Sequence, residues 1–378
     1  MNQFILINAS NLHAGGAVQV ATSIVDELSQ SGLASNIYLA LSSVVLESCL
    51  KIGADLTVFR HVEIVDIRGF EPLNLKLDNL IKEADIVFTV FGPLYSVRKA
   101  RKSIVGFAQP WIIYPKNEAY FKLPFGQRTK LRVKYFVQWL AFVRNSNLLL
   151  VEADHVRERL KVLAPEKHVL VVPNALNAVF REAIEKSPYT VPRIAQLNPR
   201  VSKTERIKLG YVGRAYSHKN IEILPKVRAA LREKYGLIVE IEVTLDDNEW
   251  AAQTEDFRRE IRNVGSMSLR ELVDFYGSLD GVLFPSLLEC FSATPLEAMA
   301  MGLPLFASNR DFVRDFCEDY PFYFDPLDPE SIADAVASSL DLPYDVLQAR
   351  LEASRAHVLS LPTATDRAKR LMELLRSL

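Results

Sequence analysis

The chain has 378 residues, of which 49% are hydrophobic and 24% are charged, and its formal net charge is −1. This length and composition exclude a disordered or fibrous protein and favour two domains over one. Residues 1–190 hold 22 Lys and Arg against 17 Asp and Glu, and the remainder holds 23 against 29, but the whole chain lacks the basic excess that would predict nucleic-acid binding.

Three cysteines (Cys49, Cys290 and Cys317) are too few and too scattered for a disulfide framework or a metal knuckle. The first residues lack the basic region of a signal peptide, and no segment is long enough to span a bilayer. These features predict a cytoplasmic protein.

Short apolar runs typical of buried strands alternate with amphipathic, helix-like segments in both halves of the chain. In the first half the runs are FILIN, NIYLAL, DIVFTVF, SIVGFA, NLLLV and HVLVVP. A second series starts at residues 207–213 and continues through a helix at 221–235, strands at 237–243 and 281–286, and a helix at 295–301. This alternation predicts the α/β class, with parallel sheets covered by helices.

The pattern breaks at 186–206, where three prolines occur without periodicity, so this segment is the predicted interdomain linker. We therefore expect two Rossmann-like domains facing across a cleft, at 1–185 and 207–360. Residues 361–378 form an amphipathic helix that we expect to pack back on the first domain.

The first predicted strand is followed by His13, Ala14, Gly15 and Gly16, and then by a helix. Adjacent glycines let the backbone approach a ligand, and a helix N-terminus attracts negative charge. A tight strand-to-helix turn is the structural alternative. The segment lacks the G-x-G-x-x-G pattern, which disfavours a dinucleotide enzyme.

The second domain opens in a comparable way, with Gly213 at a strand end and Arg214 and Lys219 in the following loop. Two cations at the carboxyl end of a strand suit a diphosphate, because each can pair with a phosphate oxygen. Exposed, solvated loop cations are the alternative.

Glu289 and Glu297 lie eight positions apart across a short loop between a predicted strand and helix. The loop lies at a carboxyl strand end, where open α/β sheets bind ligands. Glu297 has a structural alternative, because Thr294-Pro295-Leu296-Glu297 reads as a capping box with Thr294 as N-cap.

Together, the segments GYVGRAYSHKN, VVPNALN and ECFSATPLEAMAMGLPLFAS resemble the retaining GT-B glycosyltransferases, often called glycosyl transferases group 1. The resemblance covers most of the chain and implies that the E-x(7)-E motif binds a nucleotide-sugar donor. Glu289 would contact the sugar hydroxyls, Glu297 the ribose, and Arg214 and Lys219 the diphosphate; we assign Glu289, Arg214 and Lys219 to the catalytic set.

The resemblance implies further donor contacts, mainly through the backbone. They are Gly15, Gly16, Phe291, Ser292, Ala293 and Thr294 at the sugar and phosphates, and Val264 and Gly265 at the base.

The sequence departs from the family pattern at Gln109, where many members have a histidine, and at Asn174-Ala175, where Asn-Gly is frequent. Gln109 can hydrogen-bond a sugar hydroxyl but cannot accept a proton. We expect Gln109, His13 and Asn174 to be acceptor or sugar contacts. The chain has no D-x-D motif, so we predict no metal and no cofactor besides the donor substrate, a GDP-, UDP- or dTDP-sugar.

Residues 116–144 carry seven Lys and Arg and one acid, interleaved with aromatic residues. Such a stretch is typical of a segment that contacts an anionic membrane surface, and this contact would place the protein at the inner face of the plasma membrane. The alternative is an ordinary helix with a packed aromatic face and solvated charges.

The leading hypothesis is a metal-independent, retaining hexosyltransferase that uses a glycan or lipid-linked acceptor in O-antigen, capsule or lipopolysaccharide synthesis. Two alternatives stay open: a nucleotide-sugar epimerase of the same fold, which would need an acid/base cluster, and a catalytically silent glycan-binding protein.

Overall fold

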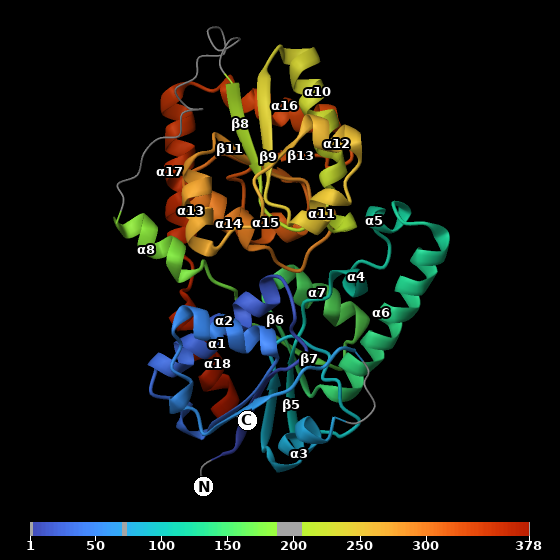
Figure 1. Ribbon diagram of the computed structural model, residues 1–378, viewed down its shortest axis with the longest axis vertical. Coiled ribbons are helices and arrows are strands. Elements are labelled where there is room, and N and C mark those ends of the chain that lie inside the picture. Colours follow the sequence, from blue (N-terminus) through green and yellow to red (C-terminus); the bar gives the residue numbers. More distant parts are fainter. Residues whose placement is uncertain (1–2, 70–73, 187–205, 378) are drawn as a thin grey trace. The chain divides into compact units, whose positions relative to one another are not determined.

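The computed structural model describes residues 3–69, 74–186 and 206–377, which form two compact α/β units (Figure 1). Unit 1 comprises Met1–Pro115, Phe125–Ala175 and Pro362–Leu378, and unit 2 comprises Lys116–Pro124 and Leu176–Leu361. Most of the predicted linker, residues 187–205, lies outside the described residues. No helix in the described ranges is both long enough and apolar enough to cross a membrane.

Unit 1 is built on a seven-stranded parallel sheet in the order β3-β2-β1-β4-β5-β6-β7. Its inner strands are almost wholly buried, as expected for continuous apolar runs covered by helices on both faces. The strands are β1 (Ile5–Ala9), β2 (Ile37–Leu41), β3 (His61–Ile64), β4 (Ile86–Thr89), β5 (Lys102–Gly106), β6 (Leu148–Val151) and β7 (His168–Val171).

Helices connect these strands along both faces of the sheet (Figure 1). They are α1 (Gly16–Gln30), α2 (Ser43–Ile52), α3 (Leu75–Glu83), α4 (Pro110–Ile113), α6 (Phe125–Asn145), α7 (Asp154–Leu163) and α18 (Ala364–Ser377), with 3-10 turns at Ala34–Asn36 and Leu56–Val58.

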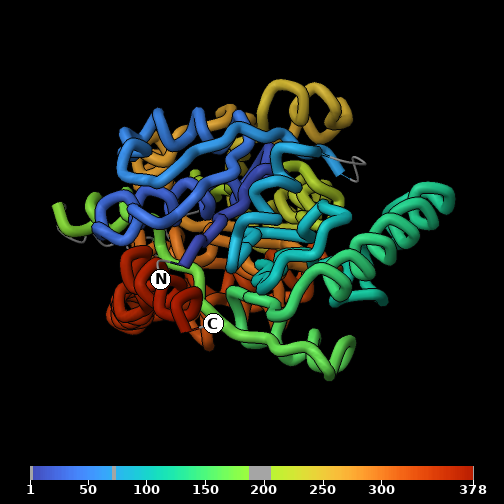
Figure 2. The backbone as a smooth tube through the Cα atoms, turned by 90° about the horizontal axis from the view of Figure 1, so that it is seen from below, coloured from blue at the N-terminus to red at the C-terminus, as the bar shows by residue number. Residues whose placement is uncertain are grey.

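The C-terminal helix α18 packs beside α1, although the two are more than 330 positions apart in sequence (Figures 1 and 2). Leu371 and Leu375 on its inner face are buried in the hydrophobic core of unit 1. The buried Arg367 donates to Ser23 of α1 and to Asn174. Apolar burial and these hydrogen bonds together hold the end of the chain on unit 1.

Unit 2 is built on a six-stranded parallel sheet in the order β10-β9-β8-β11-β12-β13. Its central strands pack tightly: a Cβ on Gly281 would meet the Phe306 ring at 2.7 Å, so β11 accepts no side chain there. The strands are β8 (Arg206–Tyr211), β9 (Ile238–Val243), β10 (Arg262–Asn263), β11 (Gly281–Phe284), β12 (Leu305–Ser308) and β13 (Phe322–Phe324).

Helices also cover both faces of the unit 2 sheet (Figure 1). The helices of unit 2 are α5 (Glu118–Phe121), α8 (Ala178–Lys186), α10 (Leu224–Tyr235), α11 (Asp247–Ala251), α12 (Glu255–Glu260), α13 (Leu269–Gly277), α14 (Ala293–Ala300), α15 (Asp311–Cys317), α16 (Pro329–Leu340) and α17 (Tyr344–Ser360), with 3-10 turns at Ser217–Lys219 and Ile221–Ile223.

The α/β class predicted from the sequence is confirmed, but the division of the chain differs from the expected one. Helix α8 belongs to unit 2, because its Phe180 is fully buried against Tyr276 of α13. The segment 116–124 also belongs to unit 2, where Lys122 pairs with Glu222 at 2.6 Å and Glu118 pairs with Arg310 at 2.9 Å. Long-range contacts decide both assignments, so the order of elements along the chain does not reveal them.

Both sheets place their first strand beside their fourth, β1 beside β4 and β8 beside β11. The strand order reverses at each of these pairs, and in open α/β sheets ligands bind just beyond the carboxyl ends of strands at such a reversal. The Gly15-Gly16 turn follows β1, and the loops that carry the predicted donor residues follow β8 and β11.

Candidate functional site

Two loops of unit 2 meet at the carboxyl ends of β8 and β11. The Leu287 N–H donates to the His218 carbonyl at 2.7 Å, and the Thr294 hydroxyl donates to the Val212 carbonyl at 3.2 Å. These bonds hold the loop that enters α14 against the loop that follows β8. Residues far apart in sequence are thereby brought to one edge of the sheet.

Lys219 and Glu289 form an ion pair at the centre of this edge, with 2.5 Å between Lys219 Nζ and Glu289 Oε1. Both side chains are largely buried, at 14% and 8% exposure. Apart from this ion pair, Glu289 Oε1 has no hydrogen-bond partner in the described part of the chain. A buried carboxylate in this state has lone pairs available to hydroxyl donors.

Arg214 is held by two carboxylates at the start of α11. Its guanidinium contacts Asp246 and Glu249, each at 2.8 Å, and Glu249 also accepts a hydrogen bond from the Ala215 N–H at 3.0 Å. Partial burial is the largest single effect and opposes the charge of Arg214, but the hydrogen bond to Glu249 and the nearby charges of Glu249 and Asp246 together outweigh burial and raise the arginine pKa. Arg214 therefore lies beside the site with its charge already compensated by acids of its own unit.

Glu297 is buried one turn inside α14, and its Oε2 accepts a hydrogen bond from the Tyr276 hydroxyl at 2.8 Å. The capping-box interpretation is wrong: α14 begins at Ala293 with Ser292 at the N-cap, and no side chain caps that end. Burial raises the pKa of Glu297 from about 4.5 to about 7, against the opposing effect of the Tyr276 hydrogen bond. Glu297 therefore titrates near neutral pH.

The remaining predicted donor residues of unit 2 occupy two loop ends. Phe291, Ser292, Ala293 and Thr294 form the entry to α14, where unpaired backbone N–H groups favour an anion. Val264 and Gly265 follow β10, and Gly265 has a φ of +85°, a conformation that favours glycine.

Unit 1 presents a different set of groups at its own carboxyl edge. Gly15 has a φ of +70° and precedes the first residue of α1, Gly16. His13 Nε2 donates to the Ile67 carbonyl at 2.8 Å, while Gln109 donates to Gln138 at 3.4 Å. Asn174 accepts from its neighbour's N–H and from Arg367 of α18, so its side-chain oxygen already serves the C-terminal helix.

Several residues that complete these loops escaped prediction from the sequence. Asn263 bonds Leu245 N, Leu245 O and Gly265 N through its side chain, and so braces the loop that holds Gly265. Burial, reinforced by Lys219 and opposed by Glu289, lowers the pKa of His218 to about 4, so this imidazole is neutral at physiological pH. The adjacency of His218 to Lys219 was the one signal available in the sequence.

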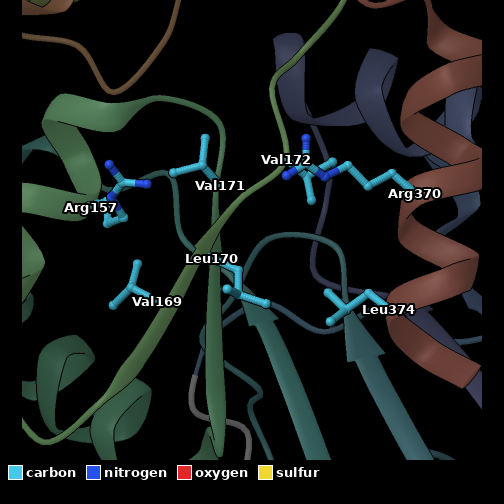
Figure 3. A pocket seen from close by; sticks show the side chains of 7 residues that line it. All are labelled: Arg157, Val169, Leu170, Val171, Val172, Arg370 and Leu374. Carbon is cyan, nitrogen blue, oxygen red and sulfur yellow. The ribbon is translucent and has the colours of Figure 1, made fainter. Parts of the chain in front are cut away.

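The pocket drawn in Figure 3 lies elsewhere, in unit 1. It has a volume of about 190 Å³ and is lined by edge strand β7 with Arg157 on one side and Arg370 and Leu374 of α18 on the other (Figure 3). None of the candidate residues lines it. The candidate site is therefore defined by its chemistry and strand-end position, not by this cavity. No group of three or more potential metal ligands occurs among residues 3–69, 74–186 and 206–377.

Comparisons with known proteins agree with this geometry. Residues 193–356 match the family described as "Glycosyl transferases group 1". The chain is 25% identical over 189 residues to the O-antigen chain mannosyltransferase RfbU of Salmonella typhimurium. This match covers 47% of the chain and 52% of the relative, so it spans about half the length of that protein.

Solved structures extend the likeness to the whole chain. Alr3699/HepE from Anabaena, in complex with UDP and glucose, matches with a TM-score of 0.69 and 14% identity over 100% of both chains. WaaG, a glycosyltransferase involved in lipopolysaccharide biosynthesis, matches with a TM-score of 0.65 and 13% identity over 97% of this chain and 98% of its own. These identities establish the fold alone. Residues 193–356 are therefore similar to the glycosyl transferases group 1, and the chain has the GT-B fold.

Proposed function

We propose that the protein is a retaining, metal-independent glycosyltransferase that moves a sugar from a nucleoside diphosphate to a glycan or lipid-linked acceptor. The observation that carries this proposal is the Lys219–Glu289 pair, largely buried at the strand-order reversal of unit 2 and close in sequence to the start of α14. A cation, a carboxylate and a helix N-terminus suit a phosphorylated sugar, since they complement phosphate and hydroxyl groups at once.

In the proposed reaction, Lys219 and the backbone N–H groups at the start of α14 stabilise the negative charge that develops on the departing diphosphate. Arg214 supplies a second cation once the diphosphate competes with Asp246 and Glu249. Glu289 accepts hydrogen bonds from the sugar hydroxyls. The proton of the attacking acceptor hydroxyl passes to the leaving diphosphate, so the new bond forms on the face from which the diphosphate departs.

Nucleotide recognition and the unit 1 contacts remain parts of the proposal. Glu297 would bind ribose hydroxyls, and the backbone at Val264 and Gly265 would read the base. Gly15 and Gly16 would approach the donor phosphates, with His13 and Gln109 at the reacting sugar or acceptor. The bond between Asn174 and Arg367 argues for an anchoring role of Asn174 in place of a sugar contact.

A role in O-antigen, capsule or lipopolysaccharide assembly is supported by the likeness to RfbU, an O-antigen chain mannosyltransferase, and to WaaG, a glycosyltransferase involved in lipopolysaccharide biosynthesis. The complex of HepE with UDP and glucose favours a UDP-sugar among the candidate donors, alongside GDP- and dTDP-sugars.

The direct test is incubation of the protein with a panel of UDP-, GDP- and dTDP-sugars, with thermal stabilisation and release of nucleoside diphosphate as readouts. One donor should raise the melting temperature and be hydrolysed slowly without acceptor. The anomeric configuration of the product, read by NMR, tests retention. Stabilisation by no nucleotide sugar would refute the proposal.

The same panel separates the two alternatives. An epimerase would convert the donor sugar and leave the diphosphate attached, and a silent binding protein would bind glycan without releasing diphosphate. The pairing of Lys219 with Glu289 favours the transferase, because a cation beside a carboxylate complements the phosphate and hydroxyl groups of a nucleotide sugar.

We further propose that helix α6 contacts an anionic membrane surface. Its inner face packs in unit 1, where Tyr135 stacks on Trp111 at 5.8 Å and Phe142 lies 4.8 Å from Phe107. Its outer face is apolar: Phe125 is 80% exposed and Phe136 is 61% exposed. Exposed apolar side chains on this face are Phe125, Val133, Phe136, Val137 and Leu140.

These five side chains lie within about 120° of the helix circumference at 100° per residue. The exposed cations Lys130, Lys134 and Arg132 flank the stripe on its two sides, and residues 125–145 include no Asp or Glu. Apolar stripes with basic flanks bind at the boundary between headgroups and acyl chains. Figure 2 shows α6, in green, extending beyond the strands of unit 1. Of the basic stretch at 116–144, only α6 is proposed to contact the membrane, because Lys122 forms an ion pair within unit 2.

Flotation with liposomes tests this surface. The protein should float with vesicles containing phosphatidylglycerol and stay in solution with pure phosphatidylcholine, and Phe136→Ser should reduce flotation severalfold. Val162→Ser on α7 is the matched control, because Val162 is also exposed, at 83%, but lies outside the stripe. Equal flotation with both vesicle types, or equal loss in both variants, would refute the membrane proposal.

A further inference from the structure

We propose that Tyr276 is a positioning residue for donor binding: its hydroxyl fixes the Glu297 carboxylate so that the carboxylate accepts hydrogen bonds from the ribose. This inference rests on the proposed function and extends it to a residue outside the E-x(7)-E motif. Tyr276 lies in α13, 21 positions before Glu297, and the two side chains meet at 2.8 Å.

The burial of Tyr276 and Glu297 makes the Tyr276 hydroxyl an important hydrogen-bond donor to the Glu297 carboxylate. Tyr276 is fully buried, at 0% exposure, and Glu297 is buried beside it. A buried carboxylate without hydrogen-bond donors is strongly disfavoured, so the Tyr276 hydroxyl provides a large part of what allows Glu297 to occupy this position. With Oε2 bound to Tyr276, the orientation of Oε1 is set as well, because the carboxylate is planar.

The Tyr276 ring is itself held in place by aromatic neighbours. Phe180 of α8 packs against it edge-to-face with ring centroids 5.7 Å apart, and Phe275 lies at 6.5 Å. Helix α13 starts with a capping box formed by Ser268 and Glu271, which fixes its first turn. The hydroxyl therefore has a defined position before any donor arrives, as pre-organised binding requires.

The hydroxyl also controls the charge of Glu297. Burial favours the protonated form of Glu297 and raises its pKa. Among the described residues, the hydrogen bond from Tyr276 opposes this effect and lowers the Glu297 pKa. The residue of α8 that packs against Tyr276 is Phe180, whose ring carries no charge. Burial, and then the Glu297 charge, raise the pKa of Tyr276 well above its ordinary value, so the hydroxyl keeps its proton and stays a donor. Without it, Glu297 would hold a proton at neutral pH and could accept fewer hydrogen bonds.

The test is Tyr276→Phe, which keeps the ring and removes the hydroxyl. At pH 7 we expect KM for the nucleotide sugar to rise about tenfold or more with a smaller change in kcat, because the lost interaction serves donor binding. KM should recover partly at pH 9, where Glu297 ionises without help. Discrimination between a ribonucleotide donor and its 2′-deoxy and 3′-deoxy analogues should also shrink.

Two further variants distinguish positioning from packing. Glu297→Gln should raise KM at all pH values, and adding Tyr276→Phe to it should cost little more, because both changes remove one interaction. Tyr235→Phe is the matched control: it removes a 2.6 Å bond from a tyrosine hydroxyl to Asp334 elsewhere in unit 2 and should leave KM unchanged.

The pH dependence of unfolding reports on the pair without any donor. Tyr276→Phe should move the titration of Glu297 to higher pH, and Tyr235→Phe should not. An unmoved titration together with a wild-type KM profile for Tyr276→Phe would reduce Tyr276 to a packing residue and overturn this inference alone. Failure of the wild-type protein to bind any nucleotide would overturn the proposed function and this inference with it.

Discussion

The carboxyl edges of the two sheets differ in how their polar groups are balanced. In unit 2 the predicted donor residues include charged side chains that are already paired, Lys219 with Glu289 and Arg214 with Asp246 and Glu249. In unit 1 the predicted residues are two glycines and the polar side chains of His13, Gln109 and Asn174, and His13 Nδ1 lies 3.7 Å from Asp66. Both edges lie at a strand-order reversal, so topology alone does not explain the contrast.

Under the proposed function, the two edges would bind different chemical groups of the substrates. The ion pairs hold the cations of the unit 2 edge in place without ligand. When a diphosphate binds, its oxygens can replace the carboxylates as partners of these cations. The amide of Gln109 in unit 1 suits sugar hydroxyls, because it can both donate and accept hydrogen bonds. Substitutions at three places test this comparison, from the largest expected effect to the smallest.

Lys219→Ala should have the largest effect. Turnover should fall by about 100-fold or more, because a cation on the leaving diphosphate acts mainly in the transition state. Stability should also fall, because Glu289 would remain buried without its partner. Lys234→Ala is the control, since Lys234 also pairs with a carboxylate, Asp334, but at an exposed position. Turnover that tracks only the loss of folded protein would remove Lys219 from the site.

Glu297→Gln should have an intermediate effect that depends on pH. The folded-state pKa is raised to about 7, so between about pH 4.5 and 7 the folded protein holds a proton that the unfolded chain releases, and wild-type stability falls as pH rises. Glutamine has no such proton. The free energy of unfolding of the variant, relative to that of the wild type, should therefore rise by roughly 2 kcal/mol between pH 5 and 8. The variant should also bind the donor more weakly.

Urea unfolding of both proteins from pH 4 to 9 measures this difference. Burial also raises the pKa of Glu152 in unit 1 to about 7. Because Glu152 is present in both proteins, its contribution cancels in the difference between their unfolding free energies. If the stability of the variant and of the wild type changed in parallel with pH, the raised pKa of Glu297 would be refuted. Unchanged donor binding by the variant would refute the proposed contact between Glu297 and the ribose.

Substitution of the two glycines in unit 1 should have the smallest effect. Gly15→Ala should cost about 1 kcal/mol, because φ is +70° and strains any residue with a Cβ. Gly16→Ala should leave stability nearly unchanged, since Gly16 is helical and a Cβ would meet no atom within 4 Å. If the backbone here approaches donor phosphates, Gly16→Ala should still raise KM. Wild-type kinetics would reduce the turn to a structural role.

Much of the fold was predictable because it rests on local patterns. Continuous apolar runs such as Gly281–Phe284 became buried parallel strands, and turn glycines followed them. The position of Glu289 in a loop after such a strand was predictable for the same reason. Helix α14 was placed two residues late, because Pro295 suggested a helix start whereas the helix already begins at Ala293.

The partners of the site residues were not predictable in this way. Tyr276 lies on α13 and Asp246 is the N-cap of α11, and nothing in the spacing of Glu297 or Arg214 indicates these partners. The outward apolar stripe of α6 was hidden for a related reason: aromatic residues occur on both faces of the helix, and only packing on Trp111 and Phe107 shows which face is covered.

The sequence by itself determined the strands, their parallel class and the motif loops at their carboxyl ends, because hydrophobic periodicity and turn chemistry act over a few residues. Only the tertiary structure decided that Glu297 is held by a tyrosine and not by a helix cap, that both site cations are compensated by acids, and that α8 belongs to unit 2. These outcomes depend on burial and on contacts between distant segments, which raise pKa values and choose partners only once the chain has folded.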